Sequence, residues 1–250
     1  MKTGVLIHGC NLNIENWRHV AWGDPPNQTG RIPQGLLVAY QTEADVIIMG
    51  TGASQKKFQF GDFENSNREL SEADYSFEYL RLYFDRLSRF DALWREIPEL
   101  QSPETIADFA DSILSKVVLD VDSMNTADEI RHAGEIFVER GVDEVFLVSS
   151  PSHIVRCLRD AAAIYQSDDR FLRIRDSIRA VPSTTCYEGT APGDVVVVEP
   201  PHRPDRHVVP THRRIQRMLA LQKLPHEDLV DLIDQFDNLL QKFENRFFNQ

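Results

Sequence analysis

Five short apolar runs, rich in β-branched residues, recur along the chain without any alternation of polar and apolar positions. They cover residues 5–8, 45–49, 116–121, 144–149 and 194–199. Uninterrupted apolar runs of this length are typical of strands buried on both faces of a parallel sheet. The pattern therefore predicts a mainly parallel sheet of about five strands.

Longer segments with apolar residues at three- and four-residue spacing separate these runs. The spacing predicts helices over residues 32–43, 71–95, 127–140 and 152–165. Strands that alternate with helices favour a Rossmann-like, doubly wound α/β fold with helices on both faces of the sheet.

The C-terminal part of the chain follows a different pattern. A proline-rich run at residues 200–210 predicts a rigid loop, and helical spacing follows over residues 211–222 and 226–247. We therefore expect a Rossmann-like domain over residues 1–207 and a C-terminal helical extension, packed on it, over residues 208–250. The apolar stripe of the last helix could cover the sheet or a second subunit of a homodimer. The polar, glycine-containing segment 55–72 is a candidate mobile loop over a site.

Composition excludes several classes of protein. The 27 Lys and Arg against 39 Asp and Glu give a net charge of −12, which argues against a nucleic-acid partner because phosphate backbones attract clustered cations. No stretch approaches the ~18 consecutive apolar residues of a membrane helix, and the N-terminus lacks a cleavage signal. The three cysteines are widely spaced, which fits a reducing cytoplasm. We expect a cytoplasmic protein without a metal site.

Small and polar residues follow four of the predicted strands. In an open parallel sheet, ligands bind in the crevice beyond the carboxyl ends of the strands. The candidate site residues in chain order are Gly9, Asn11, Gly50, Thr51, Gly52, Asp120, Asp122, Ser123, Asn125, Thr126, Ser149, Ser150, His153 and Arg156. We expect them to line one crevice.

The sequence SSPSH at residues 149–153 opens a predicted helix, whose N-terminus favours an anion. Ser150 or Ser152 is expected to cap this helix. His153 could then serve as an acid or base near neutral pH, and Arg156 could hold a phosphate or carboxylate bidentately. The alternative is a capped helix with a partly exposed histidine and a surface ion pair.

Two other strand ends also allow both structural and functional interpretations. Asp120 and Asp122 could bind a ligand hydroxyl or orient a base, whereas Ser123 or Thr126 could simply cap a helix. The Gly50–Gly52 turn would let the backbone approach a ligand closely. His8 is expected to pack at the end of its strand, and Cys10 is only a weak candidate for a nucleophile.

Three blocks of the sequence resemble those of the YdcF/SanA/ElyC family, over about residues 1–200. Residues 147–156 (LVSSPSHIVR) are similar to its VTS-x-x-H-x-x-R block, and residues 120–129 (DVDSMNTADE) are similar to its E-x-x-S-x-N-T-x-E-N block. Arg31, followed by a helix and DVIIMGTGAS, resembles the third block. Asp120, Asp128 and Glu129 depart from the family pattern. The resemblance implies a Rossmann-like fold, a binding role for Arg31, and a nucleotide-like ligand such as S-adenosylmethionine.

These observations favour an enzyme that binds a small phosphorylated or nucleotide-like metabolite and catalyses hydrolysis or group transfer. His153 would be the acid/base, Asp120 or Asp122 its electrostatic partner, and Arg156 with Ser149 and Ser150 the anion cradle. The alternative is a non-catalytic protein that senses a nucleotide or S-adenosylmethionine. A methyltransferase is a third option, although an acidic residue to hold ribose hydroxyls is missing after the second strand.

Overall fold

The computed structural model describes residues 1–52, 55–57 and 69–187, together with eight single positions between 225 and 238. For residues 55–57 and 69, only the backbone is described. The chain divides into two units, Met1–Val197 and Val198–Gln250. The predicted boundary at residue 207 lies outside the described residues.

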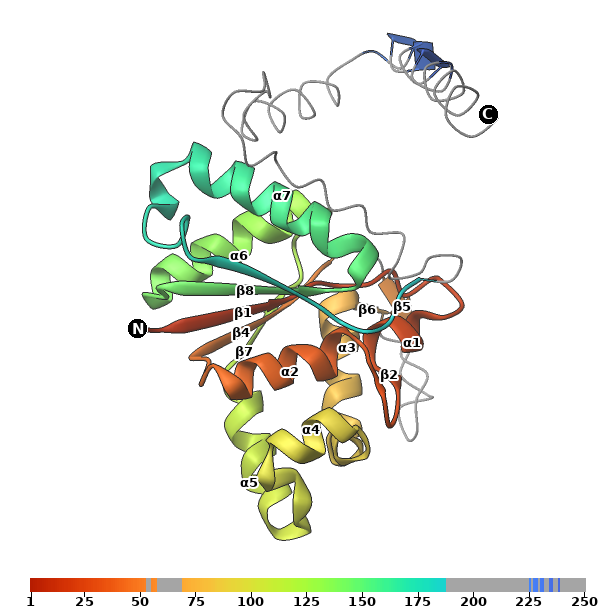
Figure 1. Cartoon of the computed structure of the whole chain (residues 1–250), viewed down its shortest axis with the longest axis vertical. Helices are drawn as coiled ribbons and strands as arrows, with labels where there is room; N and C mark the ends of the chain where they lie inside the picture. Colours follow the sequence, from red (N-terminus) through yellow and green to blue (C-terminus); the bar gives the residue numbers. More distant parts are fainter. Residues whose placement is uncertain are drawn as a thin grey trace, which may run out of the picture. The chain divides into compact units, whose positions relative to one another are not determined.

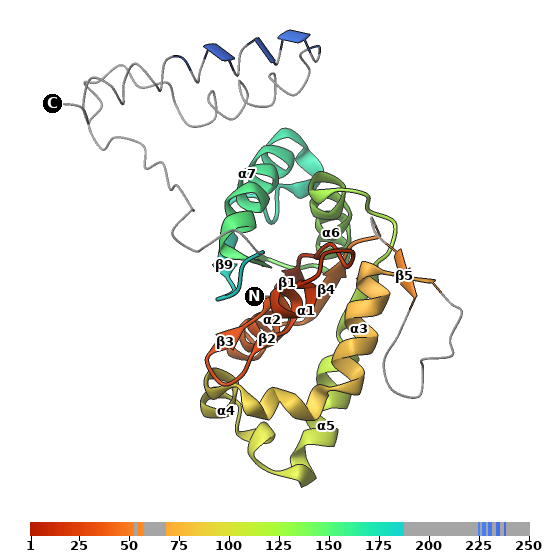
Figure 2. The same ribbon diagram turned by 90° about the vertical axis from the view of Figure 1, so that its right-hand side faces the viewer.

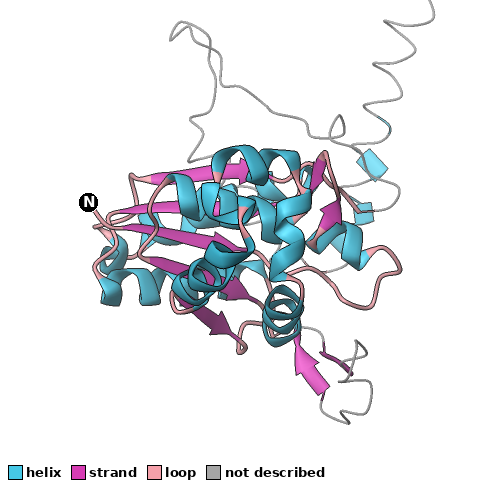
Figure 3. Cartoon of the chain, turned by 90° about the horizontal axis from the view of Figure 1, so that it is seen from below, coloured by secondary structure: helices cyan, strands magenta, loops and turns pink. Residues whose placement is uncertain are grey.

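The first unit is built on a five-stranded parallel sheet with the strand order β7-β4-β1-β8-β9. Figure 3 shows strands of this sheet side by side with helices packed around them. Its strands are β1 (Thr3–Ile7), β4 (Val46–Gly50), β7 (Val117–Asp120), β8 (Glu144–Ser149) and β9 (Ile178–Pro182). Numbered along the chain, the order is 3-2-1-4-5, which is that of a Rossmann-like doubly wound sheet. The predicted fold class is therefore confirmed.

Helices cover both faces of this sheet, as the apolar runs predict (Figures 1 and 2). On one face lie α2 (Arg31–Gln41) and α3 (Glu72–Leu82), and on the other lie α6 (Thr126–Arg140) and α7 (Pro151–Ser167). Successive side chains of a strand point to opposite faces. Val5 and Ile7 of β1 accordingly join the core beneath α2 and α3, while Leu6 joins the core beneath α6 and α7.

The predicted single helix over residues 71–95 is wrong, because the chain turns after Leu82. A 3₁₀ segment (Phe84–Arg89) follows α3 and leads into α4 (Asp91–Glu96). The buried side chains here are Phe84, Leu87, Phe90 and Leu93. They recur every three residues, which matches the three residues per turn of a 3₁₀ helix better than the 3.6 of an α-helix.

Several elements have no counterpart among the predictions. They are α1 (Trp17–Ala21), the β2–β3 hairpin (Gly23–Asp24 and Gln28–Thr29), α5 (Pro103–Leu114), two 3₁₀ segments (Pro98–Gln101 and Asp169–Phe171) and β9. Strand β9 lies at the edge of the sheet and is only partly buried, so its sequence IRAVP lacks a continuous apolar run. The predicted strand over residues 194–199 lies outside the described residues.

Other predictions meet the structure only in part. Segment 55–72 begins and ends in paired strands, β5 (Gln55–Lys57) and β6 (Glu69–Ser71), where a loop was expected. Seven described positions between 227 and 238 are helical, in agreement with the helix predicted over residues 226–247. The helix predicted over residues 211–222 lies outside the described residues. Among the helices that the structure describes, none has both the length and the apolar character needed to span a membrane.

Candidate functional site

The candidate site lies where β1 and β8 run side by side and their connections leave on opposite faces of the sheet. This is the topological switch point of a doubly wound sheet, where ligands bind in proteins of this architecture. His8 and Gly9 follow β1, and β8 ends at Ser149. Residues that follow both of these strands are among the predicted site residues.

His8 and Glu129 form a buried pair that joins the end of β1 to α6. Nδ1 of His8 lies 2.5 Å from Oε2 of Glu129, and the other carboxylate oxygen accepts a 2.9 Å hydrogen bond from the amide of Gly9. Burial alone would lower the pKa of His8, but the neighbouring Cys157 and Glu129 outweigh this effect and raise the pKa to about 10. The pair is therefore an imidazolium and a carboxylate.

His8 lies at the end of its strand, as predicted, whereas Glu129 was not among the predicted site residues. A signal for it is present: Glu129 follows Thr126 by three residues at the start of a predicted helix, so both would share a face if the helix began at Thr126, as it does in the structure. However, an acidic residue in the first turn of a helix also complements the helix dipole. From the sequence alone, this structural role is enough to explain Glu129 without a role in the site.

The glycine turn after β4 makes room for this carboxylate. A Cβ atom on Gly50 would lie 1.9 Å from Oε1 of Glu129, and one on Gly52 would lie 1.9 Å from the carbonyl oxygen of Val121. Between them, the Thr51 hydroxyl lies 2.6 Å from the Ser123 hydroxyl. The turn was expected to admit a ligand, whereas in the structure it admits Glu129 and the loop after β7.

His153 lies in the first turn of α7, between two hydroxyl groups. Its Nδ1 atom is 2.9 Å from Oγ of Ser149, and its Nε2 atom is 3.2 Å from Oγ1 of Thr126. The Cys157 sulfur lies 3.5 Å from Nδ1. Burial, followed by the positive charges of Arg31, His8 and Arg156, lowers the pKa of His153 to about 2. The ring is therefore neutral at physiological pH, in a strongly positive local field.

Arg31 is the largest fully buried side chain of the described residues. It forms hydrogen bonds with the residues that follow β1 and β8. Its guanidinium donates to the carbonyl oxygens of His8 and Gly9, to Oγ of Ser150 at 2.8 Å, and to the Tyr187 hydroxyl at 3.2 Å. Only the buried Nε atom has no acceptor in the described part of the chain. Arg31 was expected to bind a ligand, but most of its donors are used within the protein.

The expected contact of Asp120 or Asp122 with His153 is not found. Oδ1 of Asp120 accepts hydrogen bonds from the amides of Asp122 and Ser123, and lies 3.2 Å from Nδ1 of His132. The Asp122 side chain is exposed. Asp120 therefore shapes the loop after β7, and the carboxylate beside the two histidines belongs to Glu129 instead.

Helix capping also differs from the prediction. Asn125 is the N-cap of α6, where its side chain accepts from the amide of Asp128 at 3.0 Å. Ser150 occupies the N-cap of α7, but its hydroxyl accepts from Arg31 and caps no backbone amide of that helix.

Arg156 and Asn11 point away from the histidines. The Arg156 side chain is 55% exposed and lies 3.7 Å from Asp160, one turn further along α7. Oδ1 of Asn11, an exposed residue, accepts from the amide of Asn13. The expectation that the His153 and Arg156 side chains share one hollow is therefore wrong for Arg156, whose charge reaches the site only through the electrostatic field.

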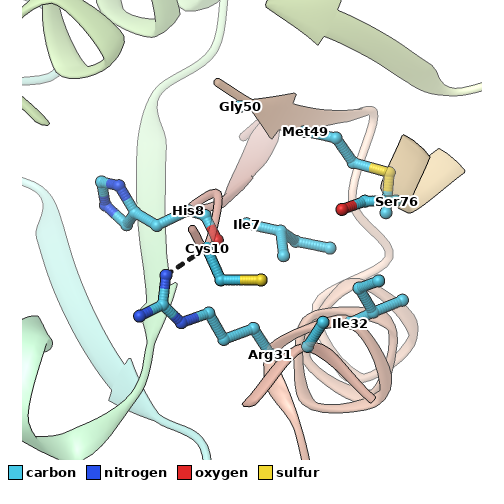
Figure 4. Close-up of a pocket in the computed structure, with 9 residues that line it drawn as sticks. Ile7, His8, Cys10, Arg31, Ile32, Met49, Gly50 and Ser76 are labelled. Atoms are coloured by element: carbon cyan, nitrogen blue, oxygen red, sulfur yellow. Dashed lines mark hydrogen bonds between the residues drawn. The ribbon is translucent and has the colours of Figure 1, made fainter. Parts of the chain in front are cut away.

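A small cavity of about 10 Å³, with room for about one water molecule, is lined in part by His8, Cys10 and Arg31. Figure 4 shows these side chains. The Cys10 thiol points into the cavity, whereas the His8 ring points away from it (Figure 4). Burial raises the pKa of Cys10 to about 12, so this thiol is a poor nucleophile. This cavity is too small to hold a metabolite.

Searches of protein-family models, of curated proteins and of solved structures found no match to this chain. The resemblance to the YdcF/SanA/ElyC family therefore stays a prediction. Within the described ranges, no three side chains of the types that ligate metals gather at one point.

Proposed function

We propose that the protein binds a small phosphorylated or nucleotide-like metabolite where α6 and α7 begin, and catalyses hydrolysis or group transfer at phosphorus with His153 as the base. One observation carries this proposal. The neutral imidazole of His153 lies between two hydroxyl groups, in the positive field of Arg31, His8 and Arg156. A phosphoryl group supplies the negative charge that such a field attracts.

The same positive field would make the pKa of His153 depend on whether the substrate is bound. An imidazole whose pKa is held near 2 is a weak base, because burial disfavours its protonated form and the neighbouring cations repel it. A bound phosphoryl anion offsets these charges and raises the pKa of His153 toward neutrality, where a general base is most effective. Proton abstraction would then become favourable only with the anion in place.

Isothermal titration calorimetry with inorganic phosphate and nucleoside monophosphates tests the binding step. Run in buffers of different ionisation enthalpy, the titration also reports proton uptake. We expect wild type to take up protons on binding and His153→Gln to bind without uptake. His19→Gln is the matched control, since His19 pairs with Asp24 at the surface and should leave the uptake unchanged. No binding of any phosphorylated compound would overturn the proposal.

Turnover distinguishes the enzyme from a sensor. Across a panel of phosphate esters followed by ³¹P NMR, we expect His153→Ala to lose at least about 100-fold in rate, as for removal of a positioned proton-transfer group. Binding of a nucleotide or S-adenosylmethionine, without turnover of any compound, would favour the non-catalytic alternative. The small volume of the cavity and the internal use of Arg31 are the observations that favour this alternative.

Arg156 has a smaller role here than the sequence alone suggests. It is half-exposed and pairs with Asp160, so we expect Arg156→Gln to weaken phosphate binding by only about 0.2–1 kcal/mol, the range of screened surface charges. Arg159→Gln is a matched control, because Arg159 contacts the same carboxylate but is not among the charges that act on His153. Equal losses in the two variants would remove Arg156 from the site.

A further inference from the structure

Thr126 is the less buried of the two hydroxyl-bearing residues that flank the His153 ring. It is the first residue of α6, directly after the cap Asn125, and is 8% exposed, whereas Ser149 on the other side of the His153 ring is completely buried. Its Oγ1 atom lies 3.2 Å from Nε2 of His153. Hydroxyl and imidazole are thus within hydrogen-bond reach, as a nucleophile and its base must be.

The opposite side of the ring fixes which nitrogen can act as the base. A neutral imidazole carries one N–H and one lone pair. If Nδ1 donates its proton to Ser149 at 2.9 Å, the lone pair of Nε2 faces Thr126 and can accept the hydroxyl proton. Ser149 is then a positioning residue, which sets the tautomer that makes Thr126 nucleophilic.

The backbone at the start of α6 complements a charged phosphoryl group. The amides of Thr126 and Ala127 have no acceptor in the described part of the chain, because the Asn125 side chain binds the amide of Asp128 and its carbonyl binds that of Glu129. These two N–H groups precede thirteen further residues of helix and lie at its positive dipole end. A phosphoryl group bonded to Thr126 would lie next to them.

Resting on the function proposed above, we infer that Thr126 is the nucleophile and that the reaction passes through a phosphothreonine. Oγ1 of Thr126 bonds to phosphorus while the bond from phosphorus to the leaving oxygen breaks. The hydroxyl proton passes to Nε2 of His153 and from there to the leaving oxygen. Water then attacks phosphorus, gives a proton to His153, and the bond to Oγ1 breaks as that proton returns to Thr126. The net reaction is hydrolysis of the ester to an alcohol and phosphate.

The test uses the full chain with p-nitrophenyl phosphate or acetyl phosphate as phosphoryl donor, quenched in acid and analysed by mass spectrometry of intact protein and peptides. We expect one added phosphoryl group on the peptide that contains Thr126. Thr126→Ser should keep the adduct, now on serine, whereas Thr126→Val and His153→Ala should lose it together with at least 100-fold of the turnover rate. Thr42→Val, at the end of α2, is the control and should behave as wild type.

The outcomes separate this inference from the proposed function. Turnover that persists in Thr126→Val, or an adduct on another residue, overturns Thr126 as the nucleophile and leaves a phosphoryl-transfer enzyme in which water attacks directly. Failure of wild type to bind inorganic phosphate or to turn over either donor overturns both. If Thr126→Val does not fold, Thr126→Ser still decides: its adduct on serine supports the inference, and turnover without an adduct opposes it.

Discussion

The imidazole rings of His8 and His153 meet edge to face with their centroids 5.9 Å apart, yet their pKa values are displaced in opposite directions. Glu129 forms a hydrogen bond with His8 and not with His153, which helps to keep His8 protonated. The positive charge of His8 in turn contributes, with burial and Arg31, to the low pKa of His153. Two titratable groups whose pKa values are pushed apart are a common arrangement in acid–base sites. The same arrangement makes stability depend on pH at both ends of the scale.

On the alkaline side, we expect the free energy of unfolding to fall as pH rises. The folded-state pKa of His8 is about 10, above the unfolded value of 6.5, because Cys157 and Glu129 outweigh the effect of burial. Its contribution to stability is therefore complete below about pH 6.5 and is lost as pH rises toward about 10. Urea denaturation between about pH 7 and 9.5 should show the fall in wild type and a smaller one in Glu129→Gln. Parallel curves would mean that Glu129 does not hold the proton.

On the acid side, His153 should limit stability. Burial and the charges of Arg31, His8 and Arg156 hold its folded-state pKa at about 2, well below the unfolded value of 6.5. Below about pH 6.5, His153 is therefore protonated in the unfolded chain but stays neutral in the folded chain. The free energy of unfolding decreases as pH falls through this range. In urea denaturation between about pH 7 and 5, the free energy of unfolding should decrease more in wild type than in His153→Gln. Protonation of carboxylates decreases it in both proteins, so the difference between them reports on His153. An equal loss in the two proteins would contradict a neutral, shielded imidazole.

Removing the carboxylate of Glu129 should be costly even near neutral pH. Taking away one partner of a buried ion pair leaves the other charge unpaired, which typically costs about 3–5 kcal/mol. We expect Glu129→Gln to lose roughly this much in urea denaturation. Glu135→Gln, on the same helix but at the exposed ion pair with Arg170, should change stability by less than about 1 kcal/mol. Similar losses in both variants would show that the buried His8–Glu129 pair contributes no more to the free energy of unfolding than an exposed ion pair does.

Much of the fold could be predicted from the sequence because the central strands are buried on both faces. Strands β1 and β4 are continuous apolar runs that contribute alternate side chains to two cores, and this pattern is visible without a structure. Strand β9 lacks it, since one side of this strand has no neighbouring strand among the described residues. The turn after Leu82 was missed because three-residue apolar spacing is also compatible with an α-helix.

The position of the candidate site could be predicted, but its internal contacts could not. Parallel strands bring their carboxyl ends to one edge, so His153 and Thr126 were placed together correctly. Partner choice is decided by distances in three dimensions: Asp120 is close to the end of its strand, yet it bonds to His132, and Glu129 reaches across to the end of β1. Residue type and spacing do not distinguish these two carboxylates.

Gly50→Ala tests how tightly Glu129 is enclosed. The added Cβ would lie 1.9 Å from Oε1, and the carboxylate cannot withdraw without giving up its bonds to His8 and Gly9. Overpacking of this kind typically costs about 1–3 kcal/mol, and breaking the ion pair would add to it. We therefore expect a lower urea midpoint and a smaller alkaline fall in stability than in wild type.

Gly35→Ala is the comparison that isolates this effect. Its Cβ would clash with Cγ1 and Cδ1 of the buried Ile7 side chain, so this variant is overpacked as well, but at a site without contact to Glu129. Alanine in a helix is also favoured over glycine by about 1 kcal/mol, which offsets part of that cost. That variant should lose less stability than Gly50→Ala and keep the full alkaline fall. The double variant Gly50→Ala/Glu129→Gln should lose less than the sum of the single losses, because both substitutions break the same pair. Strictly additive losses would show that Gly50 is required for a reason unrelated to Glu129.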